Sequence, residues 1–307
     1  MNNELTNIIK GEAINLGFSF CSIAKVNSLD KEAIHLKNWL KNNYHGEMAF
    51  MENNLDKRIN PELLFDNAMS IICVGLNYFT KENKTLDNYK IAKFAYGKDY
   101  HYIIKERLGK LINIIKKTFP DANARAFVDS APVMDKAWAQ RSGMGWMGKN
   151  TCLLNKKTGS FFFIGEIIID LELEYDQLEK DHCGTCTKCI DACPTSALIA
   201  PYILDARKCI SYLTIENKNE ELPVELKDYF HNNIFGCDIC QDVCPWNIKF
   251  AKAHNDEDLK PIDAVLDFTK KDWEHLTQTD FKVLFKNTSL ERTGYKRLMR
   301  NINFLKK

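Results

Sequence analysis

The sequence lacks the long apolar runs that membrane-spanning segments need. Its strongest apolar run, residues 161–169, is short and is interrupted by Glu166, whereas a transmembrane helix takes about 20 apolar residues. The first ten residues include Glu4 and contain no apolar stretch of the kind found in secretory signals. We therefore expect a soluble cytoplasmic protein with no membrane partner.

The sequence also lacks an excess of charge of either sign. Its 42 basic and 41 acidic residues leave a net charge of +1, so the overall charge indicates no class of partner. Nor does it contain a G-x-G-x-x-G pattern after a strand, and we therefore predict no dinucleotide site. Gly143, Gly145 and Gly148 instead indicate either an irregular turn or a backbone that approaches something closely.

Cysteine, by contrast, is abundant, and its spacing carries the strongest signal. Cys183, Cys186, Cys189 and Cys193, followed by Pro194, form the pattern C-x2-C-x2-C-x3-C-P, with which bacterial ferredoxins bind 4Fe-4S clusters. The first three thiolates lie on one tight loop, whereas the fourth reaches a different cluster. A second cluster is therefore implied.

A second cysteine run supplies that cluster. Cys237, Cys240 and Cys244 precede Pro245 in the pattern C-x2-C-x3-C-P, and Cys209 lies between the two runs. We expect two 4Fe-4S clusters, one held by Cys183, Cys186, Cys189 and Cys244, and the other by Cys193, Cys209, Cys237 and Cys240. The alternative is structural zinc, but a zinc site has no use for the third cysteine or for the Cys-Pro ending.

The other three cysteines, Cys21, Cys73 and Cys152, lie in apolar surroundings and are expected to be buried thiols. With eight cysteines assigned to clusters, a reducing compartment fits better than a disulfide-bonded secreted chain.

The sequence predicts an α+β fold in three parts. These are an N-terminal α/β domain over residues 1–170, a ferredoxin-like double-cluster module over 171–255, and a short helical basic tail over 256–307. Helices are expected at the N-terminus, over 31–53, after residue 101 and after Pro132, and strands over 18–24, 70–76, 124–128 and 160–169. The third helix shows an apolar stripe at Ile104, Leu108, Leu111, Ile112 and Ile115. Residues 57–61 read as a polar turn, 80–90 as an exposed loop, and 170–181 as an acidic linker.

About 170 residues precede the cysteine module, too many for a plain ferredoxin, so this part should contain the site that uses the electrons. Its candidates for proton transfer are Asp99, His101, Asp129 and Asp135. Asp129 ends a predicted strand and could face a pocket. From spacing alone, however, the sequence Asp-Ser-Ala-Pro favours a helix cap at Asp129.

Seven motifs in order resemble one family closely. They are Lys-Arg-Ile-Asn-Pro at 57–61, Tyr-Gly-Lys-Asp-Tyr-His at 96–101, Val-Asp-Ser-Ala-Pro-Val at 128–133, Gly-Trp-Met-Gly-Lys-Asn at 145–150, the cysteine run at 183–193, Cys-Ile-Ser-Tyr-Leu-Thr at 209–214 and Gly-Cys-Asp-Ile-Cys-Gln at 236–241. From about residue 10 to residue 302 the chain resembles the epoxyqueuosine reductases, which are cobalamin-dependent and related to the reductive dehalogenases. The resemblance implies reduction of epoxyqueuosine to queuosine in a tRNA anticodon loop, the last step of queuosine synthesis.

The resemblance also implies roles for individual residues. The proton donor of the family maps to Asp129, with Asp135 as the fallback. Cobalamin contacts map to Arg58, Asp129, Lys149, Asn150, Leu153, Ile164, Ile210, Ser211, Asp238 and Ile239, many of them through the backbone. Because Asp99 and His101 do not continue into D-x-H-x-x-G, we expect the cobalamin to be base-off and without a protein ligand below the cobalt.

The C-terminal tail is locally basic. It carries Arg292, Lys296, Arg297 and Arg300, which we expect to contact tRNA phosphates, although a basic tail is often only a solvated surface. Longer family members continue into HEAT-like repeats, so we expect this chain to be a short form. It should act as a monomer that receives electrons from a low-potential donor.

Three rival interpretations remain at this stage. The first is a reductive dehalogenase-like enzyme for a small molecule, although such enzymes commonly carry a twin-arginine signal, which this sequence lacks. The second is a non-catalytic ferredoxin-type electron-transfer protein without cobalamin. The third is a zinc-stabilised nucleic-acid-binding protein without iron.

Overall fold

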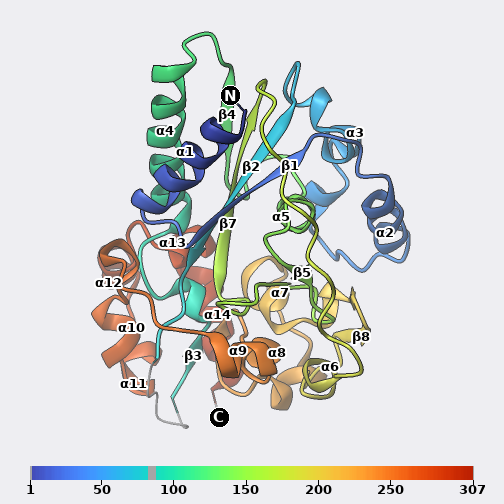
Figure 1. Ribbon diagram of the computed structural model, residues 1–307. Coiled ribbons are helices and arrows are strands. Elements are labelled where there is room, and N and C mark those ends of the chain that lie inside the picture. Colours follow the sequence, from blue (N-terminus) through green and yellow to red (C-terminus); the bar gives the residue numbers. More distant parts are fainter. Residues whose placement is uncertain (1, 82–87, 307) are drawn as a thin grey trace.

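The computed structural model describes residues 2–81 and 88–306. Its centre is a four-stranded sheet in the order β1-β2-β7-β4 (Figure 1). The strands are β1 (Phe20–Lys25), β2 (Ser70–Asn77), β7 (Phe162–Ile169) and β4 (Ala124–Phe127). Every neighbouring pair is antiparallel. The mixed α+β class is confirmed, whereas the α/β description of the N-terminal part is wrong, because alternating helices and strands do not by themselves fix strand direction.

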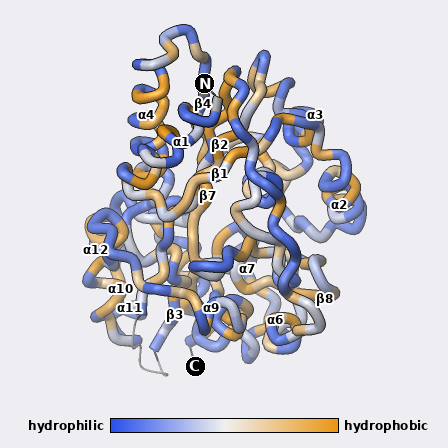
Figure 2. Tube along the Cα trace, in the orientation of Figure 1, coloured by the Kyte–Doolittle hydropathy of each residue, from blue (hydrophilic) through white to orange (hydrophobic). Residues whose placement is uncertain are grey.

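Helices cover both faces of this sheet. On one face lie α1 (Asn2–Asn15) and α4 (Tyr100–Thr118), and on the other lies α5 (Asp135–Arg141). Figure 2 shows apolar residues on the strands and on the helices that pack against them. The predicted stripe on α4 is confirmed, with Ile104, Leu108, Leu111 and Ile115 buried. The helix packs closely on β7, because a Cβ on Gly165 would come within 2.5 Å of Ile104 Cγ2.

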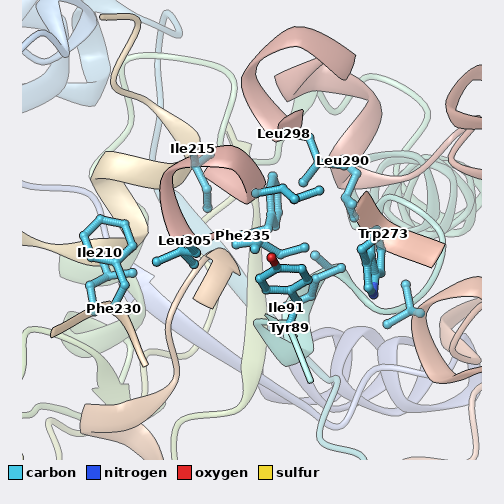
Figure 3. Close-up of a cluster of buried hydrophobic side chains, with 14 of the residues drawn as sticks. Tyr89, Ile91, Ile210, Ile215, Phe230, Phe235, Trp273, Leu290, Leu298 and Leu305 are labelled. Carbon is cyan, nitrogen blue, oxygen red and sulfur yellow. The ribbon is translucent and has the colours of Figure 1, made fainter. Parts of the chain in front are cut away.

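A second core lies at the other end of the molecule (Figure 3). It joins residues 89–96, which precede α4, with residues 206–235 and 264–305. Tyr89, Phe235, Trp273 and Leu298 are all at most 1% exposed there. The parallel pair β3 (Lys90–Ile91) and β10 (Asn233–Phe235) belongs to this core. The C-terminal helices are therefore packed against the cysteine-bearing part of the chain.

The remaining elements are short. The helices are α2 (Asp30–Lys41), α3 (Leu55–Ile59), α6 (Lys188–Asp191), α7 (Ile210–Ile215), α8 (Ile239–Asp242), α9 (Pro245–Phe250), α10 (Asp263–Asp267), α11 (Lys270–Glu274), α12 (Gln278–Leu284), α13 (Ser289–Thr293) and α14 (Tyr295–Leu305). The strands are β5 (Trp146–Met147), β6 (Leu153–Leu154), β8 (Leu198–Ala200) and β9 (Ile203–Leu204). 3₁₀ helices occupy Ala49–Met51, Pro61–Leu63, Lys93–Ala95, Ala206–Lys208, Val224–Phe230 and Glu257–Leu259.

Several local predictions need correction. Residues 57–61 are not a polar turn, because they include most of α3 and bury Arg58. The helix expected over 31–53 ends at Lys41. Within 80–90, residues 82–87 lie outside the described residues, and Tyr89 is buried rather than exposed. No helix in the described ranges is both long and apolar enough to cross a membrane.

The glycine-rich loop approaches its own chain. A Cβ on Gly145 would meet the carbonyl oxygen of Leu154 at 2.0 Å, and one on Gly143 would meet that of Gln177 at 2.1 Å. Of the two interpretations of these glycines, close approach is therefore the one that the structure supports.

Candidate metal centres and active site

The first predicted set of cysteines lines one pocket. Cys183, Cys186, Cys189 and Cys244 surround a cavity of about 150 Å³. The first two lie on the loop before α6, Cys189 lies within α6, and Cys244 immediately precedes α9. Four thiols around a space of this size suit a multi-atom cluster better than a single zinc ion, whose four sulfur ligands would each lie about 2.3 Å from it.

The loop that carries these thiols is fixed from outside. Lys149 Nζ donates hydrogen bonds to the carbonyl oxygens of Gly184 at 2.6 Å and Cys186 at 2.9 Å. The Trp146 ring packs at 4.9 Å from both the His182 and the Trp246 rings, and His182 and Trp246 line the pocket. A bound group at this point would thus be held in a prearranged loop.

The second predicted set also gathers in one place. Cys237 interacts electrostatically with Cys209 and Cys193, and Cys240 with Cys237 and Cys209. Burial, together with the charges of the neighbouring thiols, raises the pKa of the Cys237 thiol to about 12. Because buried thiolates persist only beside a cation, and a coordinating metal deprotonates a thiol outright, this donor set fits a metal cluster. In the described part of the chain no three His, Cys, Asp or Glu side chains are arranged to hold a single metal ion.

The other three cysteines fall into two kinds. Cys73 is fully buried, as the sequence predicted, whereas Cys21 is only partly buried, although burial still raises the pKa of its thiol to about 12. Cys152, by contrast, lies close enough to Cys240 for the two thiols to interact. It therefore lies beside the second cysteine set.

Asp129 stands at the end of β4, in an exposed turn. Its φ of +46° lies in the left-handed region, which is uncommon for a residue other than glycine and is found at functional sites. Tyr100 donates a hydrogen bond from its hydroxyl to Asp129 Oδ2 at 2.8 Å, and the Tyr100 ring stacks on Phe163 at 4.1 Å. The helix-cap interpretation of Asp129 is wrong, since the cap position of α5 is Met134 and no side chain caps that helix.

Two further carboxyls lie behind this turn. Glu166 is 0% exposed in the central strand β7, and burial raises its pKa well above the usual range, with Asp135 adding to the effect. Burial, together with the charge of Asp129, also raises the pKa of Asp135, at the start of α5, to about 6. Sequence reasoning did not assign Glu166 a role, although its signal was a lone charge within an apolar run.

The predicted cobalamin contacts divide by exposure. Arg58 is buried and donates to the Phe50 carbonyl oxygen at 2.8 Å, Asn150 donates to that of Cys240 at 3.4 Å, and Asp238 accepts from the Lys93 backbone N–H at 2.8 Å. Leu153 and Ile210 are buried in the hydrophobic cores. Partly exposed surface remains at Ile164, Ser211 and Ile239. Of the whole set, only these three and Asp129 could offer side chains freely to a ligand, and the others could contribute mainly backbone.

The four basic residues of the tail also divide. Arg297 donates to the carbonyl oxygens of Thr293 and Ile215 at 2.7 and 3.0 Å, and Arg300 to those of Leu213 and Asn217 at 2.9 and 3.0 Å. These two guanidinium groups join α14 to the segment around the end of α7. Lys296 is exposed. Arg292 pairs with Glu216 at 2.5 Å and interacts electrostatically with Tyr100 and Asp129.

The cysteine geometry defines the class of protein. Residues 182–247 match the family model described as "4Fe-4S double cluster binding domain", so the chain is an iron–sulfur protein with a large additional domain. A catabolic reductive dehalogenase shares the fold over 82% of this chain and 33% of its own, with a TM-score of 0.52 and 14% identity. That likeness shows the fold alone.

Closer similarity gives the family. Residues 58–130 match the model "Epoxyqueuosine reductase QueG, DUF1730". The epoxyqueuosine reductase of Cellulophaga algicola is 54% identical over 301 residues, or 98% of both chains. The chain belongs to the epoxyqueuosine reductase family, which is a family of oxidoreductases.

Two solved structures bear on the site. An epoxyqueuosine reductase with an epoxyqueuosine-modified tRNA-Tyr stem loop matches at a TM-score of 0.89 and 30% identity, covering 98% of this chain and 80% of its own. The enzyme from Bacillus subtilis, whose catalytic aspartate loop is swung out of the active site, matches at a TM-score of 0.90 and 29% identity, covering 98% and 81%.

Proposed function

We propose that this protein reduces epoxyqueuosine to queuosine at the wobble position of tRNA, as a cytoplasmic monomer supplied by a low-potential electron donor. The observation that carries the proposal is Asp129, an exposed carboxylate held by Tyr100 and close to Arg292, in a chain with two gathered sets of four cysteines. The division into residues 1–170, 171–255 and 256–307 is proposed as cobalamin-binding, double-cluster and tail regions.

The two cysteine sets would hold one 4Fe-4S cluster each, in the assignment that the spacing predicts. The pocket between Cys183, Cys186, Cys189 and Cys244 supports the first set, and the mutual electrostatics of Cys193, Cys209, Cys237 and Cys240 support the second. Lys149 would keep the first loop in its binding shape.

Cobalamin, when bound base-off, would supply strongly reducing electrons to the carbon–oxygen bond of the epoxide. The corrin would lie on the partly exposed Ile164, Ser211 and Ile239 and on the backbone of residues 149–153. Arg58 and Asp238 would act from behind the site, since their side chains are buried and already hydrogen-bonded. His101 is paired with Asp99 at 2.7 Å, in keeping with our proposal of no protein ligand to cobalt.

Asp129 would be the proton donor. The overall change is epoxide plus two electrons and two protons, giving the cyclopentene and water, so the leaving oxygen must be protonated. Asp129 is exposed and fixed by Tyr100, which lets it meet a substrate oxygen directly. Asp135, the fallback, lies deeper and would not reach the substrate as readily.

The substrate would be held by its phosphates. A wobble base can be turned out of the anticodon loop into a pocket while Lys and Arg neutralise the backbone. Arg292 and Lys296 suit this role because their side chains are exposed, and Arg292 lies near Asp129. Arg297 and Arg300 were also predicted to bind tRNA, but their hydrogen bonds support a structural role first.

Nucleoside mass spectrometry tests the proposal. Anaerobically reconstituted protein is incubated with tRNA containing epoxyqueuosine and a low-potential reductant, with and without cobalamin. We expect the nucleoside to lose one oxygen only when cobalamin is present. No loss, from protein shown to contain both clusters and cobalamin, would reject this substrate and favour a small molecule. Protein that binds clusters but no cobalamin would instead be an electron-transfer protein.

A further inference from the structure

The carboxyls of Asp135 and Glu166, which lie behind Asp129, take no part in the proposed proton transfer. Glu166 is 0% exposed, and both of its carboxyl oxygens, together with Asp135 Oδ1, are buried without a hydrogen-bond donor from the protein. Leaving buried carboxylate oxygens unpaired is costly, because the charge loses its hydration and gains nothing in return. A native fold would not keep three such oxygens together without compensation.

A proton between the two carboxyls provides that compensation. The side chains of Asp135 and Glu166 lie within hydrogen-bonding distance of each other, but two carboxylates cannot bond unless one of them is protonated. With the proton on Glu166, its hydroxyl donates to Asp135 and the pair carries one negative charge instead of two. Burial raises the pKa of both groups, which keeps this proton in place near neutral pH.

The charged groups around the pair are few. Arg58 on α3 interacts with Asp135 and Asp129, and its Nε is also buried without a partner. Cys73 on β2 faces Glu166, and Tyr100 on α4 interacts with Asp135. One Arg58 charge can balance one buried carboxylate but not two. The surroundings therefore also favour a singly protonated pair.

The pair is joined to Asp129 through the backbone. The Asp135 carboxyl interacts with the backbone N–H of Asp129, the residue whose φ is +46°. Glu166 pairs across the sheet with Phe127, two residues before Asp129. Arg58 reaches the same turn at the Val133 carbonyl oxygen, 3.5 Å away. These contacts thus fix the backbone of the turn, whereas the Tyr100 hydrogen bond fixes only the Asp129 side chain.

We propose that Asp135 and Glu166 form one protonated positioning device, which holds the strand-to-helix turn so that Asp129 keeps its left-handed conformation and its contact with Tyr100. Neither carboxyl touches the substrate. The purpose of this device depends on the proposed role of Asp129 as the proton donor. The shared proton and the conformation of the turn can, however, be measured without any substrate.

The first test looks for the proton in the cluster-loaded protein. Infrared spectroscopy should show a protonated-carboxyl carbonyl band at neutral pH, and this band should be absent from Glu166→Gln but present in the matched control Glu172→Gln, which alters an exposed acid. A wild-type spectrum without such a band, or a band that survives Glu166→Gln unchanged, overturns the proposal.

The second test uses stability against pH. In the unfolded chain both acids titrate near pH 4, whereas in the folded protein burial raises the pKa of Asp135 to about 6 and raises the pKa of Glu166 well above its usual range. The folded state therefore binds more protons above pH 4, so wild-type stability should fall as pH rises through 6 and beyond. Glu166→Gln should flatten this fall in Tm, and Glu172→Gln should not. Equal slopes in all three proteins contradict the shared proton.

The third test reads the turn itself. A crystal structure of Asp135→Ala should show the Asp129 turn outside the left-handed region and the Tyr100 hydrogen bond lost. An unchanged turn overturns the positioning role. With epoxyqueuosine tRNA, Asp135→Ala and Glu166→Ala should lower kcat by about 100-fold with little change in KM, and Glu166→Gln should recover most of that loss. If the wild type proves inactive on this tRNA while the band and the displaced turn are observed, the proposed substrate fails and the device stands.

Discussion

Two regions of this molecule bury groups that would be charged in water, and they compensate for it differently. The cysteine region gathers thiols whose burial raises their pKa, as at Cys237, and only a metal cluster lets them ionise. The region behind Asp129 gathers carboxyls that share one proton and one arginine, Arg58. The first region thus depends on an added cofactor, whereas the second is complete in the polypeptide. Loss of metal should therefore disable the first and leave the second intact.

Removal of one cluster ligand should have the largest effect. Cys186→Ser takes one thiolate from the pocket shared with Cys183, Cys189 and Cys244, so the first cluster should not assemble and electrons should not pass. We expect about half of the iron to be lost, together with all measurable turnover. Iron analysis and the visible spectrum check this, with Cys21→Ser as the control that keeps its iron. Full iron content in Cys186→Ser would disprove the ligand assignment.

The two regions also differ in how much of each can be predicted from sequence. Seven of the eight cysteines lie in two runs with fixed short spacings, because one loop must cap one face of a cluster, and such local geometry can be recognised in the sequence. The Asp135–Glu166 pair is made by an α5–β7 contact between residues 31 positions apart in the sequence. Tyr100 reaches Asp129 from α4 in the same way. Contacts of this kind depend on the antiparallel strand order, which the hydrophobic pattern does not specify.

The basic tail is a second case in which contacts between distant parts of the chain could not be predicted from the sequence. Its positive charge could be read from the sequence, but the carbonyl oxygens that receive Arg297 and Arg300 belong to the segment around α7, over 70 residues earlier. Local charge therefore predicted the same role for all four basic residues, whereas in the structure two of them are exposed and two are hydrogen-bonded to backbone carbonyl oxygens. Helix positions such as the α4 stripe were predictable, since burial there follows a local period of 3.6 residues.

The second-largest loss of turnover should come from neutralising the proposed proton donor. Asp129→Asn keeps the shape of the side chain but cannot donate a proton as an acid, and we expect kcat to fall by about 10²- to 10⁴-fold. Iron content should stay at the wild-type level, because Asp129 belongs to neither cysteine set, and cobalamin should still bind, because the other predicted contacts remain and Asn keeps the shape of the side chain. Asp121→Asn, an exposed acid before the same strand, serves as the control. Full turnover by Asp129→Asn would exclude its role as donor.

Removing the hydroxyl above Asp129 should have a smaller effect. Tyr100→Phe deletes the 2.8 Å hydrogen bond to Asp129 but keeps the stacking on Phe163. A bond to a charged group contributes about 1.5–3 kcal/mol, so kcat should fall by roughly 10- to 100-fold. Tyr102→Phe, on the same helix with an exposed side chain, should act like wild type. An equal loss in both variants would point to damage to α4 rather than to the aspartate.

The smallest expected effect separates the two kinds of tail arginine. Arg292→Ala should weaken tRNA binding and lower the slope of log K against log salt by about 1, because one phosphate contact is lost. Arg300→Ala should leave that slope unchanged and instead lower Tm, since it removes the hydrogen bonds to the Leu213 and Asn217 carbonyl oxygens. Each variant is the other's control, measured by salt titration of tRNA binding and by thermal unfolding. If Arg300→Ala changed the slope of log K against log salt and left Tm unchanged, the Arg300 guanidinium of the wild type would have to leave those carbonyl oxygens to bind tRNA. The tail would then be a mobile clamp on the substrate rather than a fixed support for α7.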